Sequence, residues 1–471
     1  MSSRPLLPSH PRAHCNPNHQ SRQAPRIQAA AESRAVQRLR QAESALWNHY
    51  GMNLVVHSHD NNTPLLLETH HHGHDTTTTT TTLEESKYTY CPHTLQEMVL
   101  ELPHDCHASR VAGIRTARLW QLYIPKKKED PTSITTTTTA ETEPENTTSK
   151  EKEEEEDEEI MLFVHGGGGT PADFAPLLPQ FLSLPLRKTR YMYFLERPGN
   201  GLSPAVNFRN YDMATFYAEF VKQVVEGLLS RHSQNQKVHI IGNSLGGATA
   251  LWYSQAHPER VQSLSFLGVP ACFQGMVFPW YFHILRCIPA SLFALLVHMA
   301  AVLPQMMMPV VYAIFWVFAV PFHVLPKVYL CHLCETLALP QNAISFQSTL
   351  QPMWEYASST PKTETAVSSI PNNHRKTLQP TTTPTTTTMG SWKLEDLQTL
   401  QDVYHIPVLF VQGRGDGWGD DLFTTPAQRQ VITKGIGARH YLQDLGQGHL
   451  PWWSHPVEMA QALEDFWKEP K

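Results

Sequence analysis

The stretch 237–252 constrains this chain more than any other, because its pattern requires a strained turn between two regular elements. The β-branched apolar residues within 238–241 predict a buried strand, and the small and apolar residues at 248–252 predict a helix. Between them lies the turn sequence Gly-Asn-Ser-Leu-Gly at 242–246. A strand, a G-x-S-x-G turn and a helix in this order are typical of a nucleophile elbow, which presents a serine at the edge of a sheet.

The turn needs glycine at both ends for a steric reason. A serine in such an elbow takes a strained backbone conformation, and side chains at Gly242 and Gly246 would collide with the neighbouring strand and helix. We therefore expect Ser244 to be a nucleophile, with Asn243 completing the elbow. The backbone N–H of Leu245, at the positive end of the helix, is expected to point towards a substrate carbonyl.

A second glycine-rich stretch, at 166–169, follows a short run that is apolar on both faces, as a central parallel strand requires. Four glycines let a ligand approach the backbone closely and leave N–H groups free to donate, which an oxyanion hole requires. We expect the amide of Gly166 or Gly167 to act together with that of Leu245. His165 is expected to orient this loop through a hydrogen bond rather than to act as an acid or base.

Alternating strands and helices run through most of the chain and predict an α/β fold, a mostly parallel sheet covered by helices on both faces. A break near Gly113 suggests a hairpin between the first two strands. The predicted strands lie at 95–102, 110–124, 160–164, 191–195, 238–241, 261–268, 406–413 and 441–445, and the clearest helices at 29–50, 173–182, 211–230, 248–252 and 456–467.

Threonine runs at 76–82, 135–139 and 381–388 and an acidic run at 151–159 cannot bury enough apolar surface to offset their ordering entropy. We therefore expect one globular domain with disordered insertions rather than the two or three domains that 471 residues would allow. The predicted organisation is a disordered tail at 1–28, an N-terminal part of the core at 29–270 with insertions at about 57–88 and 126–159, a cap at 271–357, a Ser/Thr/Pro-rich linker at 358–392, and a C-terminal part of the core at 393–471.

Charge and cysteine content exclude several classes of protein. The acidic run accounts for more than the whole net charge of −6, so the remainder is nearly neutral and shows no basic face for nucleic acid. The seven cysteines are scattered, and the pair Cys331 and Cys334 has no partner pair at zinc-site spacing. The N-terminus has no apolar stretch typical of a secretory signal, so an intracellular protein is expected. We expect no metal and no cofactor.

The segment between Arg286 and Lys327 contains no charged residue. Two nearly continuous apolar runs at 287–304 and 306–322 approach the length of a membrane span, and a cation flanks each end. One interpretation is a helical hairpin that dips into a membrane, so that 287–326 contacts lipid. The other is an apolar cap folded over an acyl pocket, and the prolines that interrupt both runs favour it.

Three residues that could form a catalytic triad each follow the end of a predicted parallel strand. Ser244, Asp416 and His449 occur in the chain order associated with the nucleophile elbow, and ligand crevices form at this edge of open α/β sheets. His449 would take the serine proton, and Asp416 would hold the imidazole in the correct tautomer. The competing acids are Asp420 and Asp421, and the competing histidines are His440 and His455.

The motifs at 164–167, 196–203, 242–246, 413–416 and 448–449 together resemble the α/β-hydrolase fold family, in the single-domain branch of serine esterases, lipases and epoxide-hydrolase-like enzymes. The similarity covers roughly 95–270 and 394–469. It implies an eight-stranded, mostly parallel sheet with a cap inserted after the sixth strand. Two departures stand out: Glu196 occupies a position where this branch usually has Asp, and the cap is unusually long and apolar.

Within this resemblance, a serine at 244 favours ester, thioester, amide or C–C hydrolysis over reactions that need a carboxylate nucleophile. The apolar cap favours a lipophilic carboxylic ester, so the expected partner is a small lipophilic acyl substrate. An acyltransferase, an amidase or peptidase with the same triad, and a non-catalytic membrane-associated protein on the same scaffold remain as alternatives.

Overall fold

The computed structural model describes residues 24–57, 64–66, 94–126, 158–184, 188–268, 280–289, 291–293, 295, 324–358, 394–414 and 440–468. Its strands are β1 Asn53–His57, β2 Pro64–Leu66, β3 Thr94–Glu101, β4 Thr116–Ile124, β5 Glu158–Val164, β6 Thr189–Leu195, β7 Val238–Asn243, β8 Val261–Leu267, β9 Val408–Arg414 and β10 His440–Gln447. Its α-helices are α1 Ala24–His49, α2 His107–Ala112, α4 Leu178–Ser183, α5 Met213–Leu229, α6 Leu245–Ala256, α7 Trp280–Cys287, α10 Lys327–Ala338, α11 Pro340–Ser358, α12 Leu394–Asp402 and α14 Pro456–Lys468. Short 3₁₀ helices are η2 Pro171–Leu177, η3 Phe208–Asn210, η4 Pro258–Arg260 and η6 Pro451–Trp453.

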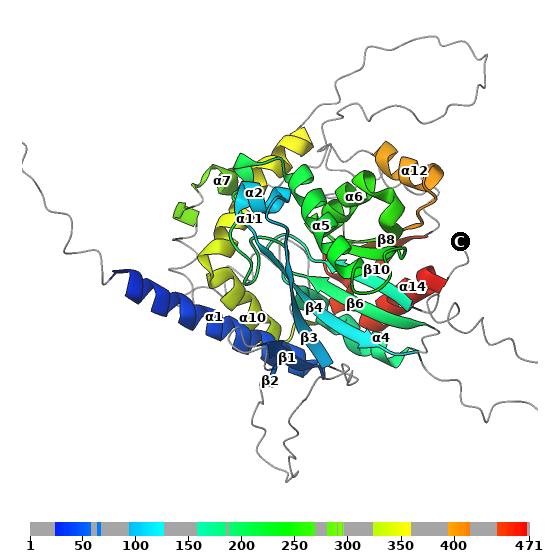
Figure 1. The fold of residues 1–471 in the computed structure, drawn as a ribbon, viewed down its shortest axis with the longest axis horizontal. Helices are drawn as coiled ribbons and strands as arrows, with labels where there is room; N and C mark the ends of the chain where they lie inside the picture. Colours follow the sequence, from blue (N-terminus) through cyan, green and yellow to red (C-terminus); the bar gives the residue numbers. More distant parts are fainter. Residues whose placement is uncertain are drawn as a thin grey trace, which may run out of the picture.

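The described strands form one sheet in the order β10-β9-β8-β7-β5-β6-β4-β3-β1-β2 (Figure 1). Neighbours from β10 to β6 are parallel. Strand β4 runs antiparallel to both β6 and β3. The predicted mostly parallel sheet is confirmed, but ten of its strands lie in the described part of the chain rather than the eight expected, because β1 and β2 extend the edge beyond β3.

The two additional strands are short and correct one sequence-based expectation. Strand β1 pairs in parallel with β3, and β2 returns antiparallel beside β1, with Val55 opposite Leu66. Strand β2 therefore lies inside the tract 57–88 that was predicted to be a disordered insertion. Its three residues are too few to give a periodic signal among the surrounding histidines and threonines.

The predicted strand 110–124 is wrong over its first residues. Helix α2 occupies that place, with Cys106 at its N-terminus accepting a hydrogen bond from the N–H of Ser109 and Gly113 at its C-terminus with a φ of 69°. Because only glycine adopts that φ without cost, Gly113 ends the helix, and β4 begins at Thr116. The two strands are antiparallel neighbours as predicted, but a helix rather than a tight turn joins them.

Strand β5 begins two residues earlier than expected, inside the acidic run. The carboxylate of Glu159 lies 2.9 Å from Nε of Arg190 and 3.6 Å from Nζ of Lys188. These cations belong to β6 or directly precede it, so the end of the acidic run is neutralised where it enters the sheet.

Alternate residues of the central strand β5 pack into two separate apolar cores, one on each face of the sheet. Ile160, Leu162 and Val164 face a core that includes residues of α2, α5, α6 and α12. Met161 and Phe163 face a second core that includes residues of α1, α4, α10 and α14. Figure 1 shows α5 and α6 on the opposite side of the sheet from α4 and α14. This two-sided burial explains why β5 reads as a continuous apolar run.

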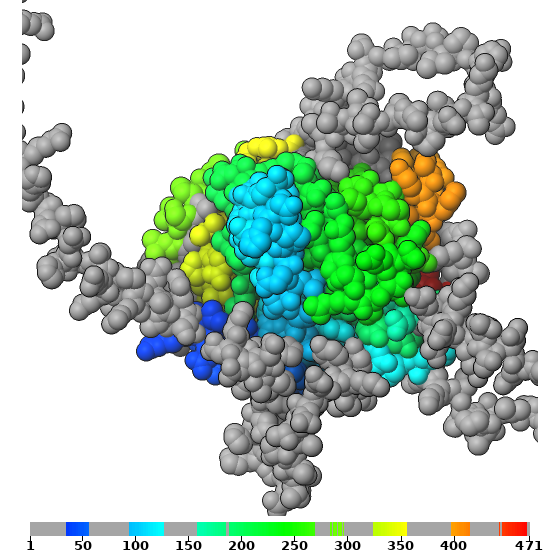
Figure 2. All heavy atoms as spheres, viewed as in Figure 1, coloured from blue at the N-terminus to red at the C-terminus, as the bar shows by residue number. Residues whose placement is uncertain are grey.

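The chain between β8 and β9 holds α7, α10 and α11 among its described residues, in the segment where a cap at 271–357 was predicted. These helices lie along one side of the molecule, at the left of the space-filling view (Figure 2). Most of the apolar stretch, at 296–323, lies outside the described residues, so both interpretations of it stay predictions. In the ranges described, no helix combines the length and the apolar character needed to cross a membrane.

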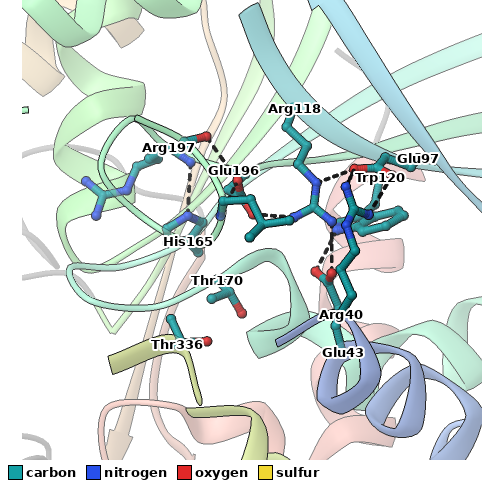
Figure 3. A network of polar contacts seen from close by, with 12 residues as sticks. Arg40, Glu43, Glu97, Arg118, Trp120, His165, Thr170, Glu196, Arg197 and Thr336 are labelled. Carbon is teal, nitrogen blue, oxygen red and sulfur yellow. Dashed lines mark hydrogen bonds and ion pairs between the residues drawn. The ribbon is translucent and has the colours of Figure 1, made fainter. Parts of the chain in front are cut away.

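A buried ionic cluster fixes α1 and the loop after β6 to the antiparallel edge of the sheet. The guanidinium of Arg118 on β4 contacts the carboxylates of Glu97 (2.5 Å), Glu196 (2.6 Å) and Glu43 (2.8 Å), all of them nearly fully buried (Figure 3). Glu196 also accepts hydrogen bonds from the N–H of Leu202 and the hydroxyl of Ser203. The carboxylate found where Asp was expected therefore closes its own loop and anchors that loop to β4.

Burial and the oppositely charged neighbours shift the pKa values within this cluster in opposite directions. Burial would lower the pKa of Arg118, but the three surrounding carboxylates raise it well above its usual range. Burial and the neighbouring Glu43 raise the pKa of Glu196, although Arg118 opposes the shift. Arg118 is thus the cation that pairs with Glu43 and Glu196, whereas Glu97 also pairs with Arg40 (3.0 Å).

We expect the substitution Arg118→Met to lower the free energy of unfolding by about 3–5 kcal/mol, because it leaves buried carboxylates without their cation. Urea denaturation followed by tryptophan fluorescence measures the change. Arg38→Ala is the control, since Arg38 pairs with Glu335 at an exposed site and should cost no more than about 1 kcal/mol. Equal costs for the two variants would contradict the structural role assigned to Arg118.

Candidate active site

Ser244 stands between β7 and α6 with φ 51° and ψ −122°, a backbone conformation that non-glycine residues rarely adopt. Its side chain is partly exposed, whereas the flanking residues 243 and 245 are buried. The strained turn expected from the sequence is therefore present, and it lifts the hydroxyl-bearing residue out of the packed layer.

Close backbone contacts leave no room for a side chain at either glycine of the turn. A Cβ on Gly242 would lie 2.5 Å from Cα of Gly247 and 2.6 Å from the carbonyl oxygen of Gly246. A Cβ on Gly246 would overlap the carbonyl oxygen of Val164 and lie 2.5 Å from that of His165. The collisions predicted from the sequence thus occur, with α6 in the first case and with the end of β5 in the second.

The glycine loop after β5 lies directly against the elbow. A Cβ on Gly166 would lie 2.7 Å from Oδ1 of Asn243 and 3.1 Å from Cβ of Ser244. A Cβ on Gly167 would lie 3.8 Å from Cδ2 of Leu245. Leu245 is the first residue of α6, so its N–H belongs to the helix turn that lacks intrahelical acceptors. The three amide groups expected to bind an oxyanion therefore come from adjoining segments beside Ser244.

His449 is brought to the same edge of the sheet. Nδ2 of Asn243 donates to the carbonyl oxygen of Leu267 (2.8 Å) and lies 3.4 Å from that of His449. A Cβ on Gly268, directly after β8, would overlap the carbonyl oxygen of His449. The N–H of Gly448 donates to the carbonyl of Arg414 at the end of β9 (2.9 Å). Asn243 thus joins the elbow to the histidine loop, a role that its place in the motif did not reveal.

Asp416 lies outside the described residues, as do the alternative acids Asp420 and Asp421. The described chain ends two residues before Asp416, at Arg414, whose carbonyl holds the loop of His449. The structure therefore brings Ser244 and His449 to one edge of the sheet, and Asp416 stays a prediction.

His165 has its tautomer fixed by its two partners. Nδ1 lies 2.9 Å from the carbonyl oxygen of Gly166, which can only accept, and Nε2 accepts from the N–H of Arg197 (3.1 Å), which can only donate. The imidazole is therefore neutral, and burial, reinforced by the charge of Arg197, holds its pKa well below the usual range. This geometry fits the expected orienting role and not an acid–base role.

Asp173, on η2, holds the far end of the glycine loop and was not predicted. Its carboxylate accepts from the N–H of Thr170 (3.2 Å) and from the hydroxyl of Tyr329 on α10 (3.0 Å). Its carbonyl accepts from the indole N–H of Trp452, three residues after His449 (2.6 Å). Burial raises its pKa from 3.8 to about 7, against the effects of these hydrogen bonds and of Arg197. Asp173 therefore joins the glycine loop, helix α10 and the histidine segment.

Helix α11 also contacts the glycine loop, through the ring of Phe346. The ring of Phe346 would contact a Cβ on Gly168 at 3.3 Å and one on Gly167 at 4.0 Å. The helix is held by Ser345, whose hydroxyl accepts from the N–H of Val206 (2.9 Å). An aromatic side chain is thus fixed beside the amides that would bind an oxyanion.

Only weak sequence signals pointed to the contributions of Asp173 and Phe346 to the site. Asp173 follows Thr170 at the spacing of a capping box, which could have marked it as a loop anchor. Nothing in the sequence around Phe346 pairs α11 with the glycine loop. Among the described side chains, no three His, Cys, Asp or Glu residues converge as a metal site, and Cys331 and Cys334 are free thiols on α10.

A protein-family model described as "alpha/beta hydrolase fold" matches residues 159–286, which run from β5 through the elbow to α7. No curated protein sequence matches the chain. Solved structures with a similar backbone include a carboxylesterase from Bacillus subtilis, at 11% identity and a TM-score of 0.43, over 80% of this chain and 93% of that one. An enol-lactonase from Burkholderia xenovorans matches at 12% identity and a TM-score of 0.43, over 75% of this chain and 97% of that one. The Cif epoxide hydrolase from Acinetobacter nosocomialis matches at 13% identity and a TM-score of 0.44, over 79% and 88%.

The raised pKa of Asp173 predicts a pH dependence of stability. The carboxyl group of Asp173 has a pKa of about 7 in the folded protein and near 3.8 in the unfolded chain. Its contribution to stability is therefore complete below pH 3.8 and is lost as the pH rises to about 7, because the unfolded chain releases this proton more readily than the folded protein. We therefore expect the wild type to lose stability relative to Asp173→Asn over this range. Urea denaturation of both proteins at several pH values measures the difference. A constant difference between pH 4 and 8 would contradict the raised pKa.

Proposed function

From the α/β-hydrolase fold of this chain, we propose that it is a serine hydrolase that cleaves a carboxylic ester. The observation that supports this most is the backbone of Ser244, with a φ of 51° beside the glycine loop. Such strain is retained where a site requires it. The same edge of the sheet holds His449, which gives the serine a candidate base.

In the proposed mechanism, Ser244 attacks the ester carbonyl carbon while His449 takes the hydroxyl proton. The N–H groups of Leu245 and the glycine loop stabilise the oxyanion of the tetrahedral intermediate. Each such donor is worth on the order of 10²–10³ in kcat. The imidazolium returns its proton to the departing alcohol, and an acyl-enzyme remains on Ser244. Water activated by His449 then releases the acid, and Asp416 holds the imidazole throughout.

We further propose that the ester is lipophilic. The ring of Phe346 lies over the glycine loop, and its neighbour Phe293 lies 6.4 Å from it, centre to centre. Both belong to the segment inserted between β8 and β9, whose sequence is apolar over 287–322. Apolar walls next to the acyl position favour long acyl chains, because each buried methylene contributes about 0.8 kcal/mol.

We expect purified protein to hydrolyse p-nitrophenyl esters with kcat/KM rising from acetate to dodecanoate. Ser244→Ala should lose on the order of 10⁴-fold or more of this activity, because the nucleophile is removed. Release of p-nitrophenol measures both effects.

The matched control is Ser254→Ala on α6, the helix that follows Ser244, since Ser254 is buried and bonds only to the carbonyl of Ala250 among the described contacts. It should keep its activity. Full activity in Ser244→Ala would refute the assignment of the nucleophile, and cleavage of acetate alone would refute the lipophilic substrate.

Contact with a membrane through 287–326 is a separate part of the proposal. Ile284, Leu292 and Leu295 are exposed by 54%, 45% and 53%, and they directly precede or begin the uncharged stretch. Exposed apolar side chains next to such a stretch favour an interface with lipid.

We therefore expect the full chain to float with phosphatidylcholine vesicles in a density gradient, and Leu292→Glu/Leu295→Glu to reduce the bound fraction about tenfold or more. Val403→Glu, at another exposed apolar residue beyond α12, is the control and should not change it. Wild-type protein that stays at the bottom of the gradient would contradict membrane contact.

A further inference from the structure

Arg197 is a buried cation that the proposed reaction has not used. It follows β6 directly and is 1% exposed. Its Nη2 donates to the carbonyl oxygen of Gly166 (2.7 Å), and its guanidinium carbon lies 5.2 Å from the ring centre of Tyr217. Its Nε and Nη1 are buried, and no carboxylate in the described part of the chain forms an ion pair with them. In Figure 3 the side chain points away from the carboxylates around Arg118. These carboxylates therefore do not pair with it.

The carbonyl of Gly166 is held from more than one side. Besides Nη2 of Arg197, it faces Nδ1 of His165 (2.9 Å) and accepts from the N–H of Gly169 (3.3 Å). The backbone N–H of Arg197 in turn donates to Nε2 of His165, so the main chain of Arg197 fixes the imidazole whose Nδ1 contacts the same carbonyl. Three donors around one carbonyl fix the direction of that carbonyl.

The direction of this carbonyl determines that of the next amide. The described peptide bonds include no cis bond, so the C=O of Gly166 and the N–H of Gly167, which share one planar peptide, point in opposite directions. Strand β5 lies between β6, which leads to Arg197, and β7, which leads to Ser244. A carbonyl turned towards the side of Arg197 therefore turns the N–H of Gly167 towards the side of Ser244.

We infer that Arg197 is a positioning residue of the oxyanion hole: by holding the carbonyl of Gly166, it aims and polarises the N–H of Gly167 towards the carbonyl attacked by Ser244. A charged donor on a peptide oxygen makes the N–H of the same peptide a stronger donor. The sequence left Gly166 and Gly167 as alternatives, and this geometry selects Gly167. The inference rests on the proposed function.

The test compares Arg197→Met and Arg197→Lys with the wild type, with each rate divided by the concentration of sites that a fluorophosphonate titrates. Arg197→Met should lower kcat per site by about 10²-fold, as the loss of one oxyanion donor does, with KM changed less than threefold. Arg197→Lys should recover part of the loss, since an ammonium group still donates to the carbonyl. Affinity for a trifluoromethyl ketone, which forms a tetrahedral adduct with the serine, should fall in proportion to kcat/KM.

Arg190→Met is the matched control. Arg190 is as buried as Arg197, lies on β6 and pairs with Glu464 and Glu159, but it is at the opposite end of the strand from the elbow. It should lose stability and keep its kcat per titrated site.

The outcomes separate the inference from the function on which it rests. Unchanged kcat per site and unchanged ketone affinity in Arg197→Met would overturn the positioning role while leaving the hydrolase intact. If Arg197→Met does not fold, Arg197→Lys decides in the same way: a lower kcat per site with a parallel loss of ketone affinity supports the role, and wild-type values overturn it. A wild type that neither titrates nor cleaves esters would refute the proposed function itself.

Discussion

The candidate site depends on one steric constraint, the contact of three backbone segments around Ser244. The end of β5, the end of β7 and the first turn of α6 approach so closely that Gly242 and Gly246 have no room for a Cβ. This contact holds Ser244 in a conformation that it would not adopt alone. It also places the glycine loop against the serine. The position of the nucleophile and that of the expected oxyanion donors are thus set by the same packing.

Buried polar groups outside the elbow fix the loops of the site, which lie beyond the ends of the paired strands. Arg118 anchors the loop at 196–203 through Glu196, and Arg197 in that loop bonds to Gly166. Asp173 joins the other end of the glycine loop to α10 and to the segment after His449. Burying these groups costs free energy unless each is paired, so their partners are part of the site. The ion pair between α1 and β4 is in this way connected to the glycine loop beside the elbow, through Glu196, Arg197 and Gly166.

The central strands and their mostly parallel arrangement, the elbow and the glycine loop were predictable because each leaves a local pattern in the sequence. Strand β5 is apolar on both faces, and the turn at 242–246 has glycines where backbone must touch backbone. The strands β1 and β2 and the helix α2 were missed because they are short and depend on pairing or capping. The roles of Arg197 and Phe346 could not be assigned from sequence, and the capping-box spacing of Asp173 does not reveal its distant partners, which lie up to 279 residues away. Such contacts follow from the assembled sheet and not from spacing along the chain.

The most direct measurement is the location of a covalent adduct on the folded chain. A fluorophosphonate is added to full-length protein, and peptide mass spectrometry identifies the modified residue. The account predicts a single phosphonylated residue, Ser244, and no adduct after unfolding in urea, because the activated serine exists only when the elbow and His449 are assembled. No adduct on the folded protein, or an adduct on a different residue, would contradict it.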